Sequence, residues 1–293
     1  TPAYAAPPTS ERAPAKDCVH PAEHADGAGS AARGRDGAKL DHRDMTDAEK
    51  DAVEARTDAL IAGHPTTPPA TTQVPVYIHV MMDRAGNGNV TQEQIDSQIA
   101  VLNKTFAGQE SPEAAVTAYR FSLAGVYRYY KDNWHADKAS KKYRALTRVG
   151  GPETLNIWLV DFDYLGIATF PWDYPKDGDI DGIRVLYTSL PGGTETNYNL
   201  GETATHEVGH WLGLYHTFDG GCKNRRGGDE VDDTPTQAAP TNGCPEGADT
   251  CPKQEGLDPI HNYMDYSYDS CYNQFTAGQS VRMNESWLAY RAP

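Results

Sequence analysis

Hydrophobic residues recur at regular intervals in only part of this chain. Residues 1–63 are rich in Ala, Gly, Pro and charged residues, and the run Gly27–Lys39 shows no apolar periodicity. One short helix is expected there, from the N-cap Thr46, with Glu49 three residues later, to Ile61. The proline-rich stretch that follows cannot continue a helix or a sheet. We therefore expect an N-terminal segment at 1–63, a linker at 64–73 and one large domain at 74–293.

The large domain combines the periodicities of strands and helices. Apolar, β-branched runs predict strands at Val74–Met82, Arg120–Tyr129, Thr154–Asp161 and Ile183–Tyr187. Helices are expected over Glu202–Leu212 and after the capping boxes Thr91–Gln94 and Thr276–Gln279. The stretch between the last two helices is rich in Gly, Pro, Asp and Cys, which indicates irregular structure. The order predicts an α+β fold, with a mixed sheet and helices followed by loops and a C-terminal helix.

Composition and charge limit the class of protein. A chain of 293 residues with 38% hydrophobic content can bury a large core, and no run approaches the roughly 18 apolar residues needed to span a membrane. The net charge of −15 argues against a nucleic-acid partner and is compatible with calcium binding. The chain begins with Thr1, and we expect that a signal peptide has been removed and that the protein is a secreted monomer.

The candidate chemistry lies in the segment His-Glu-Val-Gly-His-Trp-Leu-Gly-Leu-Tyr-His. His206 and His210 are four residues apart, so a helix places both imidazoles on one face, where they can bind one zinc ion. Glu207 is placed to take a proton from a zinc-bound water. A continuous helix would carry His216 about 9 Å beyond His210, too far for a Zn–N bond of about 2.1 Å. Gly213 can end the helix in a left-handed conformation, so that His216 returns as the third ligand.

This motif resembles that of the metzincin metallopeptidases, in which a methionine-containing turn follows the third histidine. Met264 stands in a matching context, Asn-Tyr-Met-Asp-Tyr. Tyr266 matches the position where several metzincins carry a tyrosine that hydrogen-bonds the reacting carbonyl, and an ordinary buried aromatic is the alternative interpretation. The resemblance implies an upper subdomain with a twisted mixed sheet and the active-site helix, and an irregular, disulfide-bonded lower subdomain.

Family members also align an extended peptide substrate along a strand edge above the metal. The segment suitably placed here is Gly166, Ile167, Ala168 and Thr169. Pairing of main chains gives binding that tolerates many sequences. An ordinary strand end in the core is the alternative interpretation.

Four of the five cysteines, Cys222, Cys244, Cys251 and Cys271, follow the histidine motif. In a secreted protein they predict two disulfides rather than a second zinc site, and spacing alone allows three pairings. The chain resembles the pappalysin family of metzincins, of which ulilysin is a bacterial member, and we expect a bacterial secreted proenzyme. That resemblance implies Cys222 paired with Cys251 and Cys244 paired with Cys271.

The fifth cysteine, Cys18, stands alone in the N-terminal segment. It can be a free thiol, an intermolecular bridge or a zinc ligand that keeps the enzyme latent. We predict the third role, with residues 1–63 as a pro-segment that inhibits the enzyme intramolecularly. The maturation cut is then expected between Arg33 and Thr72, with Arg56 as one candidate.

Acidic residues directly after the zinc motif predict a calcium site. Oxygen ligands of the kind that calcium requires come from Asp229, Asp232, Asp233 and Thr234, with a solvated acidic loop as the alternative. Asp177–Gly182 imitates the start of an EF-hand loop, but Thr188 stands where the bidentate glutamate belongs. We expect a turn there.

The sequence therefore predicts a secreted zinc endopeptidase that acts on protein or peptide substrates through a zinc-bound water, Glu207 and Tyr266. One alternative is a thermolysin-like peptidase with a glutamate in place of His216. Another is a zinc-stabilised binding protein of the same fold without turnover, which has no need of Glu207. Ulilysin-type enzymes with basic specificity carry an acidic residue just before the last cysteine, where this chain has Ser270, preceded by Asp269, and the cleavage preference stays open.

Overall fold

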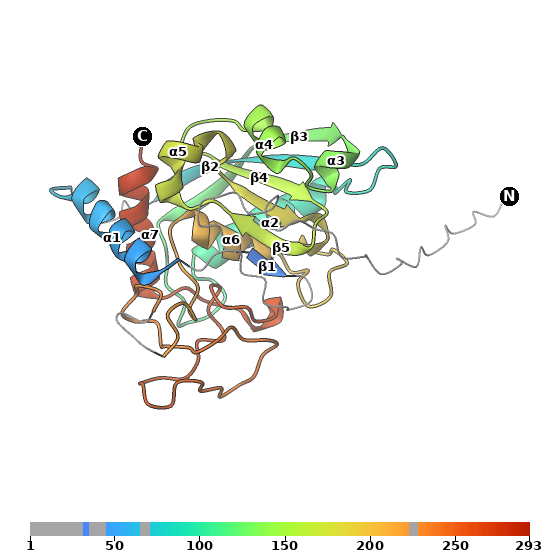
Figure 1. The fold of residues 1–293 in the computed structure, drawn as a ribbon. Helices are drawn as coiled ribbons and strands as arrows, with labels where there is room; N and C mark the ends of the chain where they lie inside the picture. The colour runs from blue at the N-terminus through green and yellow to red at the C-terminus, as the bar shows by residue number, and fades with distance from the viewer. Residues whose placement is uncertain (1–31, 35–44, 65–70, 223–227) are drawn as a thin grey trace.

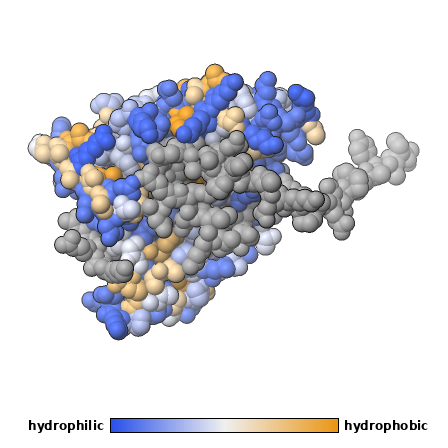
Figure 2. Space-filling model, viewed as in Figure 1, coloured by the Kyte–Doolittle hydropathy of each residue, from blue (hydrophilic) through white to orange (hydrophobic). Residues whose placement is uncertain are grey.

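The computed structural model describes residues 32–34, 45–64, 71–222 and 228–293. Cys18, the predicted zinc ligand of the latent form, lies outside the described residues. None of the described helices is long and apolar enough to cross a membrane. On the face drawn in Figure 2, hydrophilic residues cover much of the described surface, with hydrophobic residues in smaller groups between them.

A six-stranded mixed sheet forms the centre of the fold, in the order β1-β5-β6-β4-β2-β3 (Figure 1). Strands β6, β4, β2 and β3 are parallel, whereas β5 runs antiparallel to both of its neighbours, β6 and β1. The four predicted strands are β2 (Thr72–Met82), β3 (Tyr119–Tyr130), β4 (Leu155–Val160) and β6 (Ile183–Leu186). The other two strands are β5 (Tyr164–Ala168) and β1 (Ala32–Gly34). The α+β prediction is confirmed.

The strands depart from the sequence prediction at two places. Strand β2 begins at Thr72, inside the stretch expected to be a linker, because Thr72 donates to the carbonyl of Ala118 and continues the pairing with β3. Strand β1 belongs to the segment expected to lack strands, and its three residues pair with β5. Both differences arise from pairing between distant parts of the chain, which local periodicity does not encode.

The long helices begin and end close to the predicted positions. They are α1 (Asp47–Ile61), α2 (Gln92–Phe106), α6 (Glu202–Trp211) and α7 (Ala277–Tyr290). Helices α1, α2 and α7 each begin with the expected capping box. Three short helices escaped prediction, namely α3 (Asp132–His135), α4 (Ser140–Thr147) and α5 (Tyr174–Asp177). They are four to eight residues long, too short for an apolar stripe to be recognised.

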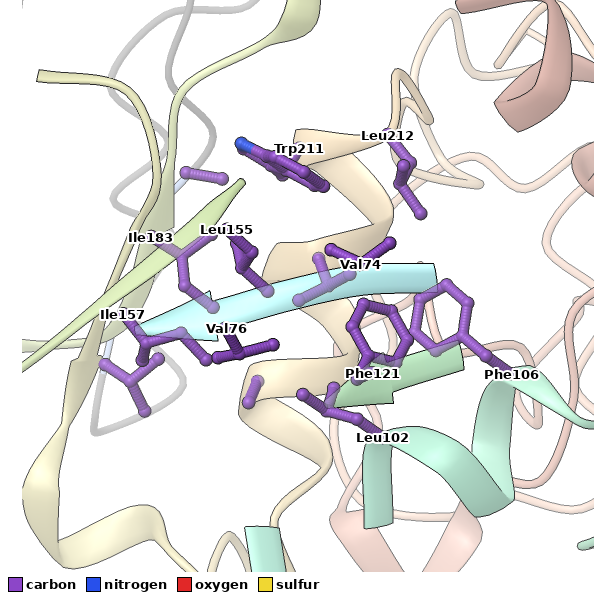
Figure 3. Close-up of a cluster of buried hydrophobic side chains, with 14 of the residues drawn as sticks. Val74, Val76, Leu102, Phe106, Phe121, Leu155, Ile157, Ile183, Trp211 and Leu212 are labelled. Carbon is purple, nitrogen blue, oxygen red and sulfur yellow. The ribbon is translucent and has the colours of Figure 1, made fainter. Parts of the chain in front are cut away.

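Helix α6 is held against the sheet by the main hydrophobic core. Its Trp211 and the following Leu212 are fully buried and lie among side chains from β2, β4 and β6 (Figure 3). Phe106 from α2 and Phe121 from β3 close the same cluster. Because burying a large apolar side chain stabilises the fold by about 1.5–3 kcal/mol, this packing fixes the helix that carries the zinc motif.

The segment between α6 and α7 is irregular, as predicted. Two disulfides hold it, Cys222–Cys251 with an S–S distance of 1.98 Å and Cys244–Cys271 with 2.09 Å. Both predicted pairings are confirmed. Helix α1 lies beside α7, where the blue and red helices run next to each other in Figure 1. Part of the predicted pro-segment is therefore packed on the large domain.

Candidate active site

Three buried histidines converge at the end of α6. The Nε2 atom of His210 lies 3.1 Å from Nε2 of His206 and 3.1 Å from Nε2 of His216. Each ring is at most 4% exposed. The structure thus brings together the three residues that the sequence predicted as zinc ligands. Among the described residues, the third member of this cluster is His216 and not a glutamate. This excludes the thermolysin-like arrangement.

The hydrogen bonds of these rings show that the site fits a metal ion. Nδ1 of His206 is 2.6 Å from the carbonyl of Tyr263, and Nδ1 of His210 is 2.7 Å from that of Leu214. A carbonyl only accepts, so each Nδ1 carries the proton and each Nε2 presents a lone pair. Burial, with His216 nearby, lowers the pKa of His210 to about 3 and keeps its ring neutral. Facing lone pairs repel unless a cation lies between them, and tetrahedral zinc places its nitrogen ligands about 3.4 Å apart.

The turn after α6 has the geometry that the motif requires. Gly213 has φ +98°, in the left-handed region, and its amide donates to the carbonyl of His210. A side chain at this position would meet Ser286 Oγ at 2.1 Å, so glycine is required for space as well as for conformation. The chain then reverses, and His216 reaches the other two histidines from a new direction.

Met264, the predicted residue of the methionine-containing turn, packs against α6 at Gly209, the residue before His210. Its side chain is fully buried. A Cβ atom on Gly209 would lie only 2.4 Å from Sδ of Met264, so this close packing requires glycine at position 209. The carbonyl of Met264 accepts from the amide of Thr217, the residue after His216. The turn at Met264 therefore contacts the histidine motif at two places, at Gly209 within α6 and at Thr217 just after His216.

Tyr266 lies next to the histidine cluster and contacts two of its rings. Its ring centroid lies 4.9 Å from that of His216 and 5.7 Å from that of His206. Phe218 packs against both Tyr266 and His216, at 5.0 and 4.6 Å. The ring is 7% exposed.

Glu207 lies against strand β5. A Cβ on Gly166 would meet both Cγ and Oε1 of Glu207 at 2.4 Å, so β5 passes this close only because residue 166 is glycine. Opposite Gly166, across the pairing, lies Arg33 of β1. The general-base candidate and the expected substrate strand are in contact, and the edge of β5 is paired with the N-terminal segment.

A cavity of about 540 Å³ lies beside the first turn of α6. Its lining contains one histidine, His261, and the charged residues Lys104, Glu110, Glu202, Glu246 and Asp269. Burial, with Glu110 and Asp269 nearby, raises the pKa of Glu202 well above its usual range. Asp269 is 3% exposed and accepts from the amide of Leu200, whereas Ser270 is exposed. Asp269 and Ser270 both line the cavity, so an acidic side chain, Asp269, is present one residue before the position considered in the sequence.

The predicted calcium ligands are partly gathered. Asp229 and Thr234 are buried, and burial raises the pKa of Asp229 well above its usual range, although a hydrogen bond with the Thr234 side chain opposes that rise. Asp232 and Asp233 are exposed and line a second cavity of about 380 Å³, and Asp233 accepts from the amide of Gly278. No three acidic residues in the described part of the chain bring their oxygens within 4.8 Å of one another.

Two carboxylates outside the predicted zinc site, those of Asp219 and Asp181, support the motif. Asp219 Oδ1 lies 3.6 Å from Nδ1 of His216, which gives the third histidine a partner on its outer side. Asp181, in the turn that imitated an EF-hand, accepts from Trp211 Nε1 at 3.0 Å and from both Nη atoms of Arg291 at 3.0 Å. The signal for Asp219 was its place three residues after His216, but Asp181 and Arg291 are 110 residues apart and carry no local signal.

Comparisons with known proteins agree with this geometry. The family model Peptidase M43, described as pregnancy-associated plasma protein-A, matches residues 162–288. An extracellular metalloprotease of Neurospora crassa is 44% identical over 268 residues, which cover 88% of this chain and 88% of that protein. Mature mirolysin of Tannerella forsythia, solved with a cleaved peptide, has a TM-score of 0.66 at 30% identity and covers 76% of this chain and 97% of its own.

A mutant promirolysin of the same bacterium has a TM-score of 0.70 at 29% identity and covers 83% of this chain and 90% of its own. The relatives similar in sequence are fungal extracellular enzymes, which agrees with the predicted secretion but does not support the expected bacterial source. A buried triad of histidines on the predicted motif, together with 44% identity along most of the chain, leads to one conclusion. This chain belongs to the pappalysin family of metallopeptidases, Peptidase M43.

Proposed function

We propose that this protein is a secreted zinc endopeptidase in which Glu207 is the general base and Tyr266 stabilises the reacting carbonyl. The observation that carries the proposal is the contact between Glu207 and β5. Glu207 directly follows His206, one of the three converging histidines. His206, His210 and His216 would hold the zinc ion. When bound, zinc supplies a Lewis acid that polarises the scissile carbonyl and acidifies water.

The side chains of this chain then perform the proton transfers and the charge stabilisation. Glu207 takes a proton from the attacking water and passes it to the leaving amine. The phenol of Tyr266 donates to the carbonyl oxygen as negative charge develops on it. The packing of Tyr266 against two of the histidine rings supports this role. A binding protein without turnover would need neither group.

The test is hydrolysis of casein by the matured protein. Glu207→Ala is expected to retain zinc and to lose at least about 10³-fold in kcat, because the general base and its proton transfer are both removed. Tyr266→Phe keeps the ring and removes the hydroxyl, with an expected loss in kcat of about 10²-fold. Retained hydrolysis by the Glu207→Ala variant at equal zinc content would refute the mechanism.

We also propose that the N-terminal segment keeps the enzyme latent by occupying the substrate strand. Support comes from β1, which pairs antiparallel with β5 through Ala32–Ile167 and Arg33–Gly166. Extended peptides bind proteases by such β-addition. The proposed substrate strand is Gly166, Ile167, Ala168 and Thr169, the last of which directly follows the end of β5.

Cys18 remains the proposed zinc ligand of the latent form. Thiolate binds zinc strongly, and a ligand in the fourth position would exclude water from it. Cys18→Ala is expected to give activity in the uncut chain, and a variant that stays fully latent would contradict this role. The name promirolysin indicates that a relative also has a pro-form.

A structural calcium ion is proposed at Asp229 and Thr234. The burial of both side chains and their contact with each other support it, because a bound cation would favour the ionised form of a buried carboxyl group such as that of Asp229. Chelation of calcium with zinc retained is expected to lower the melting temperature. An unchanged melting curve would dismiss the site.

The acidic cavity beside α6 favours a cationic side chain in the substrate. Asp269 and Glu202 present carboxyl groups to it, and a positive group would favour the ionised form of Glu202. We propose a preference for Lys or Arg next to the scissile bond. Profiling with a peptide library tests this, and Asp269→Asn is expected to lower kcat/KM for basic peptides more than for neutral ones.

A further inference from the structure

Helix α1 makes buried polar contacts with the large domain that go beyond simple packing. Lys50 is only 4% exposed, although lysine is rarely buried without partners. Its Nζ lies 3.4 Å from Oδ2 of Asp219, 3.1 Å from the carbonyl of Gly228 and 4.5 Å from the ring centre of Tyr215. All three partners belong to the segment after α6. The charge of Lys50 is therefore neutralised only when α1 is docked.

The partner of Lys50 is also the partner of a zinc-site histidine. The other carboxylate oxygen of Asp219 faces Nδ1 of His216 at 3.6 Å. Asp219 thus lies between the ammonium of Lys50 and the imidazole of His216. Groups that bind the far side of a metal-ligating histidine fix the orientation of its ring and raise the basicity of the nitrogen that binds the metal.

A second ion pair from α1 reaches the turn that ends α6. Glu54 accepts from both Nη atoms of Arg282, at 2.7 and 2.8 Å, in the bidentate geometry of a strong pair. Nε of Arg282 donates to the carbonyl of Gly213 at 2.9 Å, and its guanidinium lies 4.6 Å from the ring centre of Tyr215. Helix α1 therefore supports the Gly213–His216 turn at both ends.

We propose that α1 is a permanent part of the catalytic domain, in which Lys50 and Glu54 are positioning residues for His216. The maturation cut then lies before Lys50, and a cut at Arg56 is excluded because it would remove both residues. Loss of α1 would remove the ion-pair partners of Asp219 and Arg282 beside the Gly213–His216 turn, together with the fixed orientation that these pairs give to the turn. The inference rests on the proposed zinc site, whereas the pro-segment that inhibits the enzyme is confined to the residues before α1.

Zinc affinity of the full-length chain tests the role of Lys50 without requiring turnover. The measurements use the Glu207→Ala background, so that self-cleavage does not intervene, and competition with a chelator of known affinity. Lys50→Met keeps most of the apolar stem and removes the charge, and its expected effect is an approximately 10-fold loss of zinc affinity. Asp219→Asn is expected to lose about 10- to 100-fold. Lys142→Met, at an exposed site on α4, is the matched control and is expected to bind zinc as the parent does.

The double variant separates positioning from general stability. If Lys50 acts through Asp219, adding Lys50→Met to Asp219→Asn causes no further loss of zinc affinity. A full additional 10-fold loss in the double variant would overturn the proposal, as would equal affinities for Lys50→Met and Lys142→Met. Melting curves of the zinc-free proteins show whether each variant is folded, and Glu54→Gln with the exposed Asp58→Asn as control repeats the comparison at the second ion pair.

The N-terminus of the self-matured wild-type enzyme provides the second test. Sequencing is expected to find a first residue before Lys50, and a fully active enzyme that begins after Glu54 would overturn the proposal. If the wild type hydrolyses no casein while the zinc affinities follow the expected pattern, the proposed function fails and the positioning role stands.

Discussion

The two halves of this site are held in place by different forces. His206, Glu207 and His210 lie on α6, which is fixed by apolar contacts with the sheet. The lower part, with Met264 and Tyr266, lies in an irregular segment that is held by two disulfides and by hydrogen bonds to buried carboxylates. A regular helix can bury a continuous apolar stripe, but an irregular segment offers little repeated surface and needs covalent and polar links instead.

Asp265 shows how the lower part is organised. Its carboxylate accepts from the amides of Thr241 and Tyr266 and from Gln237 Nε2, so one side chain links the irregular stretch 237–241 to the turn 264–266. Burial raises the pKa of Asp265, although these hydrogen bonds favour its ionised form. Such polar links are directional and specify position, whereas the apolar core around α6 supplies most of the free energy.

Removing Trp211 is expected to have the largest effect on stability. Trp211→Ala would leave a cavity between α6 and the sheet and would free the carboxylate of Asp181 from one of its donors. A loss of about 3–5 kcal/mol in the free energy of unfolding is expected. Chemical denaturation monitored by circular dichroism measures it, and the whole domain should unfold in one transition at lower denaturant concentration.

Removal of the Cys244–Cys271 disulfide is expected to lower the free energy of unfolding slightly less than Trp211→Ala does. Its effect should fall mainly on the irregular segment between α6 and α7. The bond closes a loop of 27 residues, for which the chain-entropy model gives about 3.5 kcal/mol. Cys244→Ser with Cys271→Ser should abolish hydrolysis while much of the signal of the sheet remains at moderate temperature. If activity and the sheet were lost together, the two halves would not be separable.

Gly209→Ala tests the contact that joins the two halves. Alanine favours a helix by about 1 kcal/mol, but its methyl group would meet Met264 Sδ at 2.4 Å in a fully buried place. Overpacking is expected to win, with a net loss of about 1–3 kcal/mol. The double variant with Met264→Ala should lose less than the sum of the two single losses, and strictly additive losses would show that the clash is not with Met264.

Glu202→Gln is expected to have the smallest effect, and it depends on pH. Because the folded pKa of Glu202 is raised, the folded state holds a proton that the unfolded state releases above its ordinary pKa of about 4.5. The free energy of unfolding therefore falls as pH rises above this value. The variant lacks this fall, so its melting temperature relative to the wild type should increase from pH 4 to pH 8. Equal differences at both pH values would contradict the raised pKa.

The sequence by itself determined those features that depend on neighbours along the chain. Capping boxes at Thr46, Thr91 and Thr276 marked the starts of three helices, because capping involves residues only three positions apart. The same applies to His206 and His210 on one helical face and to the break at Gly213. The disulfide pairing followed from family resemblance, since spacing alone left three possibilities.

Only the tertiary structure decided which distant residues meet. Asp181 and Arg291 hold the end of α6, β1 pairs with β5, and Lys50 contacts Asp219, which is 169 residues away in the sequence. Burial turns these ordinary surface residue types into strong determinants, because a charge removed from water must find its partner. Local sequence records neither the burial nor the partner. The motif thus specified the three histidines, while the fold decided which residues, such as Asp219 and Lys50, lie next to them.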